Sequence, residues 1–325
     1  VVSNSLVAAN DLSGIYAPPH SSDGASIRFE GNAILANGNG VFPSDGHGIY
    51  VGSGTTPRLI GNTVAYNQGP GIETEGVLNI EQAEYVNNLV YANRDHGFIE
   101  RSAGTPLVAA NAFWGNEGNE VYFRSPGDIW VFTVEDLQAF GGDFTTNLHS
   151  APDLIPEILG TIDTVMFDIA LGRSLIIDSA RPWAGTDITG FLICPDTLAA
   201  EWSRVVSTRG DSLYVLGDVA AVGSPGASYR LFDYHLSGTS PMLDTGYSSN
   251  TTEVFDIDGN VRILDGDEDG SLVVDIGADE YVPNGTSQAT VTLTYPRGGE
   301  FFLAGDTCTI TWQSSELDSL NALFT

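Results

Sequence analysis

The chain has 325 residues, of which 42% are hydrophobic, so it can form more than one domain with a large core and is not a disordered chain. Its 42 acidic and 12 basic residues, the latter all arginine, give a formal net charge of -30, which argues against nucleic acid or an anionic membrane surface as a partner. The two cysteines, Cys194 and Cys308, exclude a disulfide framework, and no apolar run approaches the ~18 residues of a membrane span.

The chain begins at Val1 without a methionine, inside the first copy of a repeat. We therefore expect a longer precursor, and the lack of a visible signal peptide is then uninformative. The acidic excess suits either a high-salt source or ordinary extracellular surroundings, and the sequence leaves both open.

A repeat covers about the first 125 residues and has the form Asn-x-apolar-x-x-Asn, followed a few residues later by Gly and an apolar residue. The second asparagine falls at positions 10, 37, 67, 93 and 116, so the steps are 27, 30, 26 and 23 residues. The segments are short, rich in strand-forming residues and broken by Gly and Asn, which does not fit helical repeats. The pattern therefore predicts a β-solenoid with one coil per copy.

Stacking of these coils predicts that equivalent side chains lie above one another at the ~4.8 Å spacing of paired strands. The two inward ladders are predicted to be Val7, Ile34, Val64, Val90 and Phe113, and Ile15, Ile49, Ile72, Phe98 and Val121. The repeated asparagines fall at turns, where each amide can bond to the next asparagine of the stack. The repeated glycines, such as Gly48 and Gly71, are expected to admit the bend that opens the next strand.

This repeat resembles the right-handed parallel β-helix family, which includes pectate lyases, polygalacturonases, alginate epimerases and many non-catalytic surface proteins. We place the coils of the β-helix in residues 1–158. The resemblance implies the fold and says little about function.

Four later motifs resemble the terminal module of bacterial choice-of-anchor β-helix proteins, which are secreted or surface proteins. The motifs lie at residues 147–155, 236–246, 256–262 and 275–281. The first two are usually close together, whereas about 75 residues intervene here. We therefore predict an inserted small antiparallel β domain at 159–235, a barrel or a sandwich, and a closing module at 236–283.

Residues 284–288 are predicted to be a linker, and residues 289–325 resemble the opening strands of an immunoglobulin-like module. That module would be truncated, because a complete sandwich needs about 100 residues. The expected fold class is all-β: a right-handed parallel β-helix, an inserted antiparallel β domain and a truncated C-terminal Ig-like segment.

An acidic loop in the closing module is the best candidate for a metal site. The candidate ligands are Asp265, Asp267, Asp269 and Asp275. Close carboxylates repel one another unless a cation neutralises them, and oxygen ligands suit Ca²⁺. Position 276 is Ile where an EF-hand loop would have Glu, so the match is partial. The alternative is a solvated acidic turn.

Strand alternation predicts an outward stripe on the face opposite the second inward ladder. The candidate ligand-binding residues on it are Tyr16, Tyr50, Glu73 and Tyr122. Tyrosines could stack on sugar rings and bond to their hydroxyl groups, so the stripe indicates glycan contact. The alternative is the ordinary preference of tyrosine for strands.

A charged group on neighbouring coils is the candidate for catalysis, if the protein is an enzyme. It consists of Glu73, Asp95, His96 and Glu100, in which two carboxyl groups could act on a glycosidic bond. The alternative is a solvated charged face. The segment around His47 resembles the Gly-His-Gly segment of polygalacturonases, but the paired aspartates and the Arg-x-Lys segment of that family are missing.

Taken together, these features favour a non-catalytic protein, secreted or on the cell surface, that serves adhesion, glycan contact or surface assembly. The expected partners are glycans, other surface proteins or further copies of the chain, and the expected cofactor is Ca²⁺. The alternative is an enzyme that degrades or modifies a polysaccharide on the face of the β-helix. A cleft with two carboxyl groups ~5–9.5 Å apart would favour that enzyme.

Overall fold

The computed structural model describes residues 1–19, 25–38, 46–77, 79–102, 104–124, 130–183, 188–197, 201–283, 290–295 and 311–315. The chain forms two compact units, Val1–Tyr281 and Val282–Thr325. The described residues are nearly all β, and their one α-helix is the short α1 (Val134–Gln138). No helix within these ranges is long and apolar enough to cross a membrane.

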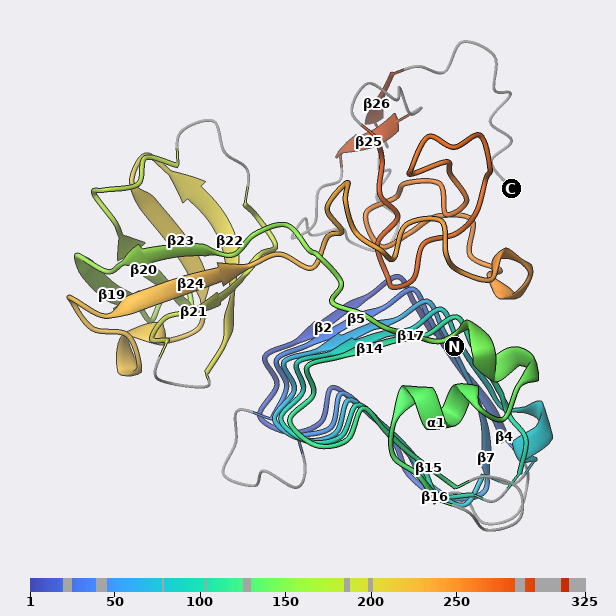
Figure 1. The fold of residues 1–325 in the computed structure, drawn as a ribbon. Coiled ribbons are helices and arrows are strands. Elements are labelled where there is room, and N and C mark those ends of the chain that lie inside the picture. Colours follow the sequence, from blue (N-terminus) through green and yellow to red (C-terminus); the bar gives the residue numbers. More distant parts are fainter. Residues whose placement is uncertain are drawn as a thin grey trace, which may run out of the picture. The chain divides into compact units, whose positions relative to one another are not determined.

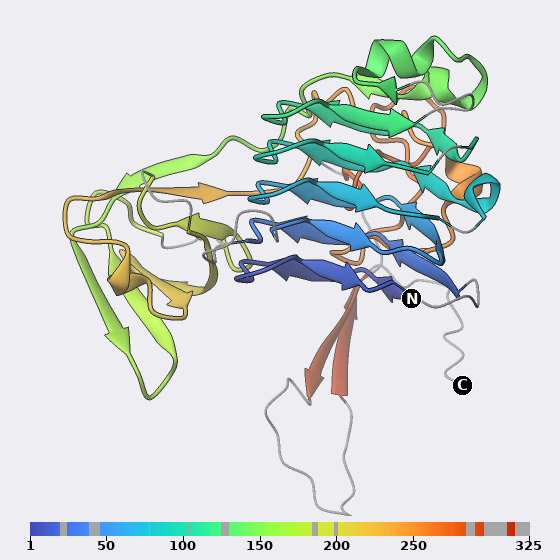
Figure 2. The same ribbon diagram turned by 90° about the horizontal axis from the view of Figure 1, so that it is seen from below.

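Three sheets build the N-terminal region, and each coil of the chain adds a strand to each of them in turn (Figures 1 and 2). The first sheet contains β1 (Val2–Ser3), β4 (Ala25–Glu30), β7 (Thr55–Ile60), β10 (Glu84–Val86) and β13 (Leu107–Ala109). The second contains β2 (Leu6–Ala8), β5 (Ala33–Leu35), β8 (Thr63–Ala65), β11 (Leu89–Tyr91), β14 (Ala112–Trp114) and β17 (Leu148–His149). The third contains β3 (Ile15–Ala17), β6 (Ile49–Val51), β9 (Ile72–Thr74), β12 (Phe98–Glu100), β15 (Val121–Arg124) and β16 (Trp130–Val131). All pairs are parallel except β15 with β16.

The predicted inward ladders are confirmed by the strand register. Ile15 pairs with Ile49, Ile49 with Ile72, and the column continues through Phe98 to Val121. The other predicted ladder pairs in the same way and consists of Val7, Ile34, Val64, Val90 and Phe113. Because like faces pile up, the core is one continuous column of apolar side chains that excludes water along the axis.

The asparagine stack is also confirmed, and a second one runs beside it. The amide of Asn37 donates to Oδ1 of Asn67 at 2.9 Å, and that of Asn67 donates to Oδ1 of Asn93 at 2.9 Å. The second stack contains Asn32, Asn62, Asn88, Asn111 and Asn147. Each buried amide also bonds to backbone, so that both stacks satisfy the polar groups of the turns from coil to coil.

The repeated glycines lie at bends directly before the strands of the third sheet, as expected, and they also let neighbouring coils approach one another. A Cβ on Gly71 would lie 2.7 Å from the amide nitrogen of Asn93, the carbonyl oxygen of Gly97 and a methyl group of Val90. Only a residue without a side chain leaves room for the asparagine stack at this position.

The inserted residues form a seven-stranded antiparallel sheet. Its strands are β18 (Ile158–Thr161), β19 (Thr164–Asp168), β20 (Arg173–Ile177), β21 (Leu192–Cys194), β22 (Ser203–Arg209), β23 (Ser212–Leu216) and β24 (Ser228–Phe232). The two outermost strands, β18 and β19, follow one another in the chain with only Ile162 and Asp163 between them. The sheet therefore curls into a barrel around its own apolar core, which contains Ile162, Ile176 and Tyr229.

The closing module is held by side chains that bond to backbone rather than by regular strands. Asp256 accepts from the backbone amides of Asp258 and Asn260 at 2.9 and 2.7 Å. Glu280 accepts from the amides of Leu264 and Asp275, both at 3.1 Å. These buried carboxylates organise loops that have few other backbone partners.

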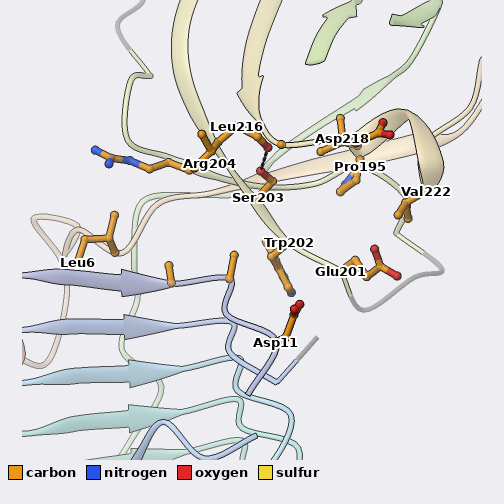
Figure 3. Close-up of a pocket in the computed structure, with 14 residues that line it drawn as sticks. Leu6, Asp11, Pro195, Glu201, Trp202, Ser203, Arg204, Leu216, Asp218 and Val222 are labelled. Carbon is orange, nitrogen blue, oxygen red and sulfur yellow. Dashed lines mark hydrogen bonds between the residues drawn. The ribbon is translucent and has the colours of Figure 1, made fainter. Parts of the chain in front are cut away.

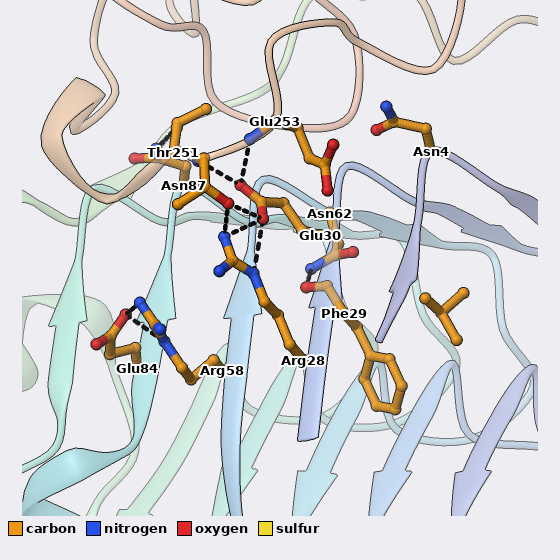
Figure 4. Close-up of polar contacts among 12 residues, drawn as sticks. Asn4, Arg28, Phe29, Glu30, Arg58, Asn62, Glu84, Asn87, Thr251 and Glu253 are labelled. Atoms are coloured by element: carbon orange, nitrogen blue, oxygen red, sulfur yellow. Dashed lines mark hydrogen bonds and ion pairs between the residues drawn. The ribbon is translucent and has the colours of Figure 1, made fainter. Parts of the chain in front are cut away.

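The closing module is tied to the first sheet through Glu30 (Figure 4). This carboxylate accepts from the backbone amides of Thr252 at 2.8 Å and Glu253 at 3.2 Å, and it pairs with Arg28. Arg58 and Glu84, on the next two strands of the same sheet, form a second ion pair at 2.8 Å.

The outer face of the second sheet is covered. Leu35 and Leu89 on that face share an apolar cluster with Met242 and Ile276 of the closing module and Trp202 of the barrel. At the C-terminal end of the coils, Val134 and Leu137 of α1 pack into the main core and cap it. The outer face of the third sheet, unlike that of the second, is accessible to solvent. Its tyrosines are exposed or partly exposed.

The second unit contains a hairpin of β25 (Thr290–Tyr295) and β26 (Thr311–Ser315), which pair antiparallel. The remainder of the predicted Ig-like segment, including Cys308, and the predicted linker 284–288 lie outside the described residues.

Candidate functional site

The predicted outward stripe lies along one column of the third sheet. Tyr16 pairs with Tyr50, Tyr50 with Glu73, and the column continues through Ile99 to Tyr122. The stripe is less uniform than expected, because Tyr16 is 61% exposed whereas Glu73 is only 6% exposed. The column therefore has tyrosines towards both ends and a covered centre.

One aromatic cluster occupies the first two coils. The rings of Tyr16 and Tyr50 stack in parallel with centroids 5.0 Å apart, and the ring of His47 lies 5.3 Å from that of Tyr50. Together with Leu12 and Ser13 they line an open pocket of about 600 Å³. Burial, together with a hydrogen bond to Glu75, raises the pKa of Tyr50 to about 12, so its hydroxyl group keeps its proton at neutral pH.

The centre of the column is a charged group on three successive coils. Glu73 bonds through one oxygen to Nε2 of His47 at 2.9 Å and through the other to Arg101 at 2.8 Å. Burial raises the pKa of Glu73, but the bonds to His47 and Arg101 outweigh this effect and hold it below its usual range. The carboxylate is therefore ionised and fixed in place, and Nδ1 of His47 faces the hydroxyl group of Ser13 at 3.4 Å.

A second aromatic cluster occupies the opposite end of the column. The ring of Tyr122 lies 4.7 Å from Trp130 and 5.4 Å from Phe132, and both of these are exposed. Arg101 approaches the face of Tyr122 at 5.9 Å and thereby joins this cluster to the charged centre. The alternation used for the sequence prediction did not reveal Trp130 and Phe132, because Trp130 lies on the antiparallel strand that returns beside β15 and Phe132 directly follows it.

The residues proposed for catalysis are not brought together. Glu100 faces the interior, where it accepts hydrogen bonds from Thr74 and Tyr85, and burial raises its pKa. The prediction that Glu100 lies on the outer face with Glu73 was wrong. Residues two apart on a strand point to the same face, so Glu100 points inward like Phe98. His96 accepts at Nδ1 from the amide of Asn119.

Asp95 stays beside His96 and accepts from its backbone amide at 2.9 Å. The partners of Glu73 are therefore His47 and Arg101 rather than Asp95, His96 or Glu100. His47 could have been found from the sequence, because it precedes its strand by two residues on the coil next to that of Glu73.

The acidic loop gathers two of its four predicted ligands and one residue that was not predicted. Asp244, Asp265 and Asp267 each offer an oxygen, and these oxygens lie within 4.8 Å of one another. Oδ1 of Asp244 and Oδ1 of Asp265 are buried and have no hydrogen-bond partner.

The other two predicted ligands, Asp269 and Asp275, lie outside this group. Asp275 uses its two oxygens to accept from the backbone amides of Asp244 and Tyr281. Burial raises its pKa to about 7. Asp269 accepts from the amide of Ser271 at 2.8 Å.

A further acidic group surrounds His235, where the chain leaves the barrel. Nε2 of His235 lies 2.9 Å from Asp258, and Nδ1 faces Asp233. Burial opposes protonation of the ring, but the bonds to Asp233 and Asp258 raise the pKa of His235 to about 11.

A pocket of about 630 Å³ lies where the barrel approaches the first coils (Figure 3). It is lined by Leu6 and Asp11 on the coils and by Trp202, Arg204 and Asp218 on the barrel. Its walls mix polar and apolar groups.

Comparison with protein families finds a match to the right handed beta helix region at residues 23–135. Neither the curated proteins nor the solved structures include a match to this chain. The three stacked sheets and this match define a right-handed parallel β-helix repeat protein.

Proposed function

We propose that the protein binds a linear, uncharged glycan along the outer face of the third sheet, without catalysing a reaction on it. The observation that carries this proposal is the arrangement of two aromatic clusters on either side of a charged group that is already paired internally. Tyr16 and Tyr50 form one cluster, and Tyr122 and Trp130 belong to the other. Four coil steps separate Tyr16 from Tyr122, a span of about 19 Å at the spacing of paired strands.

The chemistry of this face suits a sugar chain. A sugar ring has an apolar face that can stack on an aromatic ring, and its hydroxyl groups need hydrogen-bond partners at the edges. The hydroxyl group of Tyr50 and the exposed guanidinium of Arg101 supply such partners. The charge of Arg101 is offset by Glu73 and Glu75, so the centre of the face offers no excess positive charge to an anionic sugar.

We further propose that the protein acts outside the cell or at its surface, as a choice-of-anchor type protein with an Ig-like module at its C-terminal end. The motifs of the closing module support this proposal, together with the net charge of -30, which disfavours nucleic acid and anionic membrane surfaces as partners. Glycan contact on the β-helix would then serve adhesion.

A Ca²⁺ ion at Asp244, Asp265 and Asp267 is a separate proposal. It is supported by the close approach of the three carboxylates and by the two unpartnered oxygens of Asp244 and Asp265. A hard cation bound by oxygen ligands would neutralise the repulsion between these groups.

The test is a screen of the whole chain against immobilised glycans, followed by measurement of the Kd for any glycan that binds. Tyr50→Ala and Trp130→Ala should each weaken binding about five- to thirtyfold, since loss of one stacking ring costs about 1–2 kcal/mol. Phe167→Ala is the matched control, because Phe167 is an exposed aromatic residue of the barrel, far from the third sheet in the chain.

Binding that survives both face substitutions would show that another surface holds the glycan. Release of shortened or unsaturated sugars during the incubation would contradict the non-catalytic part of the proposal.

A further inference from the structure

His235 and two aspartates form a group that differs from the acidic loop because it contains an imidazole. Ligand atoms of His235, Asp258 and Asp279 lie within 4.8 Å of one another. His235 follows β24 of the barrel, whereas Asp258 and Asp279 belong to two different loops of the closing module. Three segments distant in sequence thus bring one nitrogen and two carboxylates to a single point.

We propose that this group binds a divalent transition-metal ion of the Zn²⁺ class through Nε2 of His235 and the carboxylates of Asp258 and Asp279. Imidazole nitrogen together with carboxylate oxygen is a donor set that suits such ions, whereas Ca²⁺ and Mg²⁺ prefer oxygen alone. Three protein ligands would leave a further coordination position for water or for another donor.

The orientation of the ring supports this assignment. Asp233 faces Nδ1 of His235 and also accepts from the backbone amide of His235 at 3.1 Å. A histidine that binds a metal commonly donates its other ring N–H to a carboxylate, which fixes the tautomer and aims the free nitrogen. Here Asp233 would hold the proton on Nδ1, and the metal ion would replace the proton that Nε2 shares with Asp258 and release it to solvent.

The balance of charge also favours a dication. Asp233 and Asp279 are each 4% exposed, and Asp258 lies beside them. A protonated imidazole would offset one of these three carboxylates, whereas a neutral imidazole with a bound dication would offset two. Burial makes this difference large, because an uncompensated charge is costly inside a protein.

Solvent can reach the group through a pocket. His235 and Asp258 line a hollow of about 460 Å³, together with Asn4, Thr189 and Arg204. An ion could therefore enter the folded protein, and the further coordination position would face this hollow. The bound ion would join the exit of the barrel to the closing module.

The test uses the whole chain after removal of metal with a chelator and exhaustive dialysis. Calorimetric titration with ZnCl₂ should show one tight equivalent, and the melting temperature should rise by more than about 5 °C at saturation. In Asp244→Asn, which lacks a ligand of the acidic loop, CaCl₂ at the same concentration should leave the melting temperature unchanged. Co²⁺ should give the visible absorption of a low-symmetry site with nitrogen and oxygen ligands.

Asp258→Asn removes one ligand at an exposed position and should weaken Zn²⁺ binding at least tenfold while the apo protein stays folded. Asp233→Asn should weaken it about tenfold through the loss of ring orientation, with the stoichiometry kept. Asp267→Asn, in the separate acidic loop, is the control and should leave the Zn²⁺ affinity unchanged.

The proposal is overturned if the metal-free protein takes up no Zn²⁺, or if Asp258→Asn binds Zn²⁺ as tightly as the parent chain does. Either result would mean that His235 is a protonated partner of its carboxylates and nothing more. Neither result bears on glycan binding, which concerns a different face.

Discussion

Asn67 donates its side-chain amide to Oδ1 of Asn93 at 2.9 Å, while its own Oδ1 accepts from the amide of Asn37, so one buried side chain joins three coils. Asn67→Ala would leave buried partners unsatisfied on both sides. We expect a loss of about 3 kcal/mol in the free energy of unfolding, measured by urea denaturation. Asn10→Ala, at the exposed end of the same stack, should cost less than about 1 kcal/mol. A loss for Asn67→Ala as small as that for Asn10→Ala, below about 1 kcal/mol, would show that the stack does not stabilise the coils.

Substitution of Gly71 tests whether the close approach of neighbouring coils is required for stability. A methyl group there would meet Asn93, Gly97 and Val90, all at 2.7 Å, and two of these contacts are with polar groups fixed by hydrogen bonds. Gly71→Ala should therefore destabilise the protein by about 2 kcal/mol or more, seen as a lower urea midpoint. An unchanged midpoint would mean that the coils can separate at no cost.

The charged group around Glu73 on the third sheet predicts that the free energy of unfolding depends on pH. The lowered pKa of Glu73 means that its contribution to stability is present above the unfolded pKa, near 4.5, and is lost as the pH falls through the folded value. Glu73→Gln should be less stable than the parent chain at pH 7 by about 1 kcal/mol, and the difference should shrink towards zero below about pH 4. A difference that grows on acidification would contradict this assignment of charge.

The acidic loop predicts a response to Ca²⁺. Ca²⁺ added to chelator-treated protein should raise the melting temperature, and Asp244→Asn should abolish most of the rise because it removes a ligand. Asp269→Asn is the matched control, since Asp269 lies in the same loop but outside the group of three, and it should respond as the parent chain does. A melting temperature that Ca²⁺ leaves unchanged would count against the site.

The β-helix could be predicted from sequence because its order is local and repetitive. Each coil carries its own asparagines, glycines and apolar positions, so the column from Ile15 to Val121 follows from spacing alone. The inserted antiparallel β domain could be predicted as well, since strands such as β19 and β23 are rich in strand-forming residues.

The candidate sites were harder to predict, because they depend on contacts between distant segments. Asp244 joins the acidic loop across more than twenty residues, and His235 meets Asp279 only after the chain has crossed the closing module. No spacing rule connects such residues. Glu73 was identified, but its partners were not, although the position of His47 just before the strand of the neighbouring coil could have indicated one of them.

The polypeptide chain enters and leaves the barrel at adjacent positions. Leu154 and Leu236 form an antiparallel bridge, and Ser237 donates its amide to the carbonyl oxygen of Asp153 at 3.1 Å. The residues on either side of the inserted domain are thus held together by hydrogen bonds to each other. Because its two ends are adjacent, a domain inserted at this position can be exchanged or removed without a change in the fold of the coils.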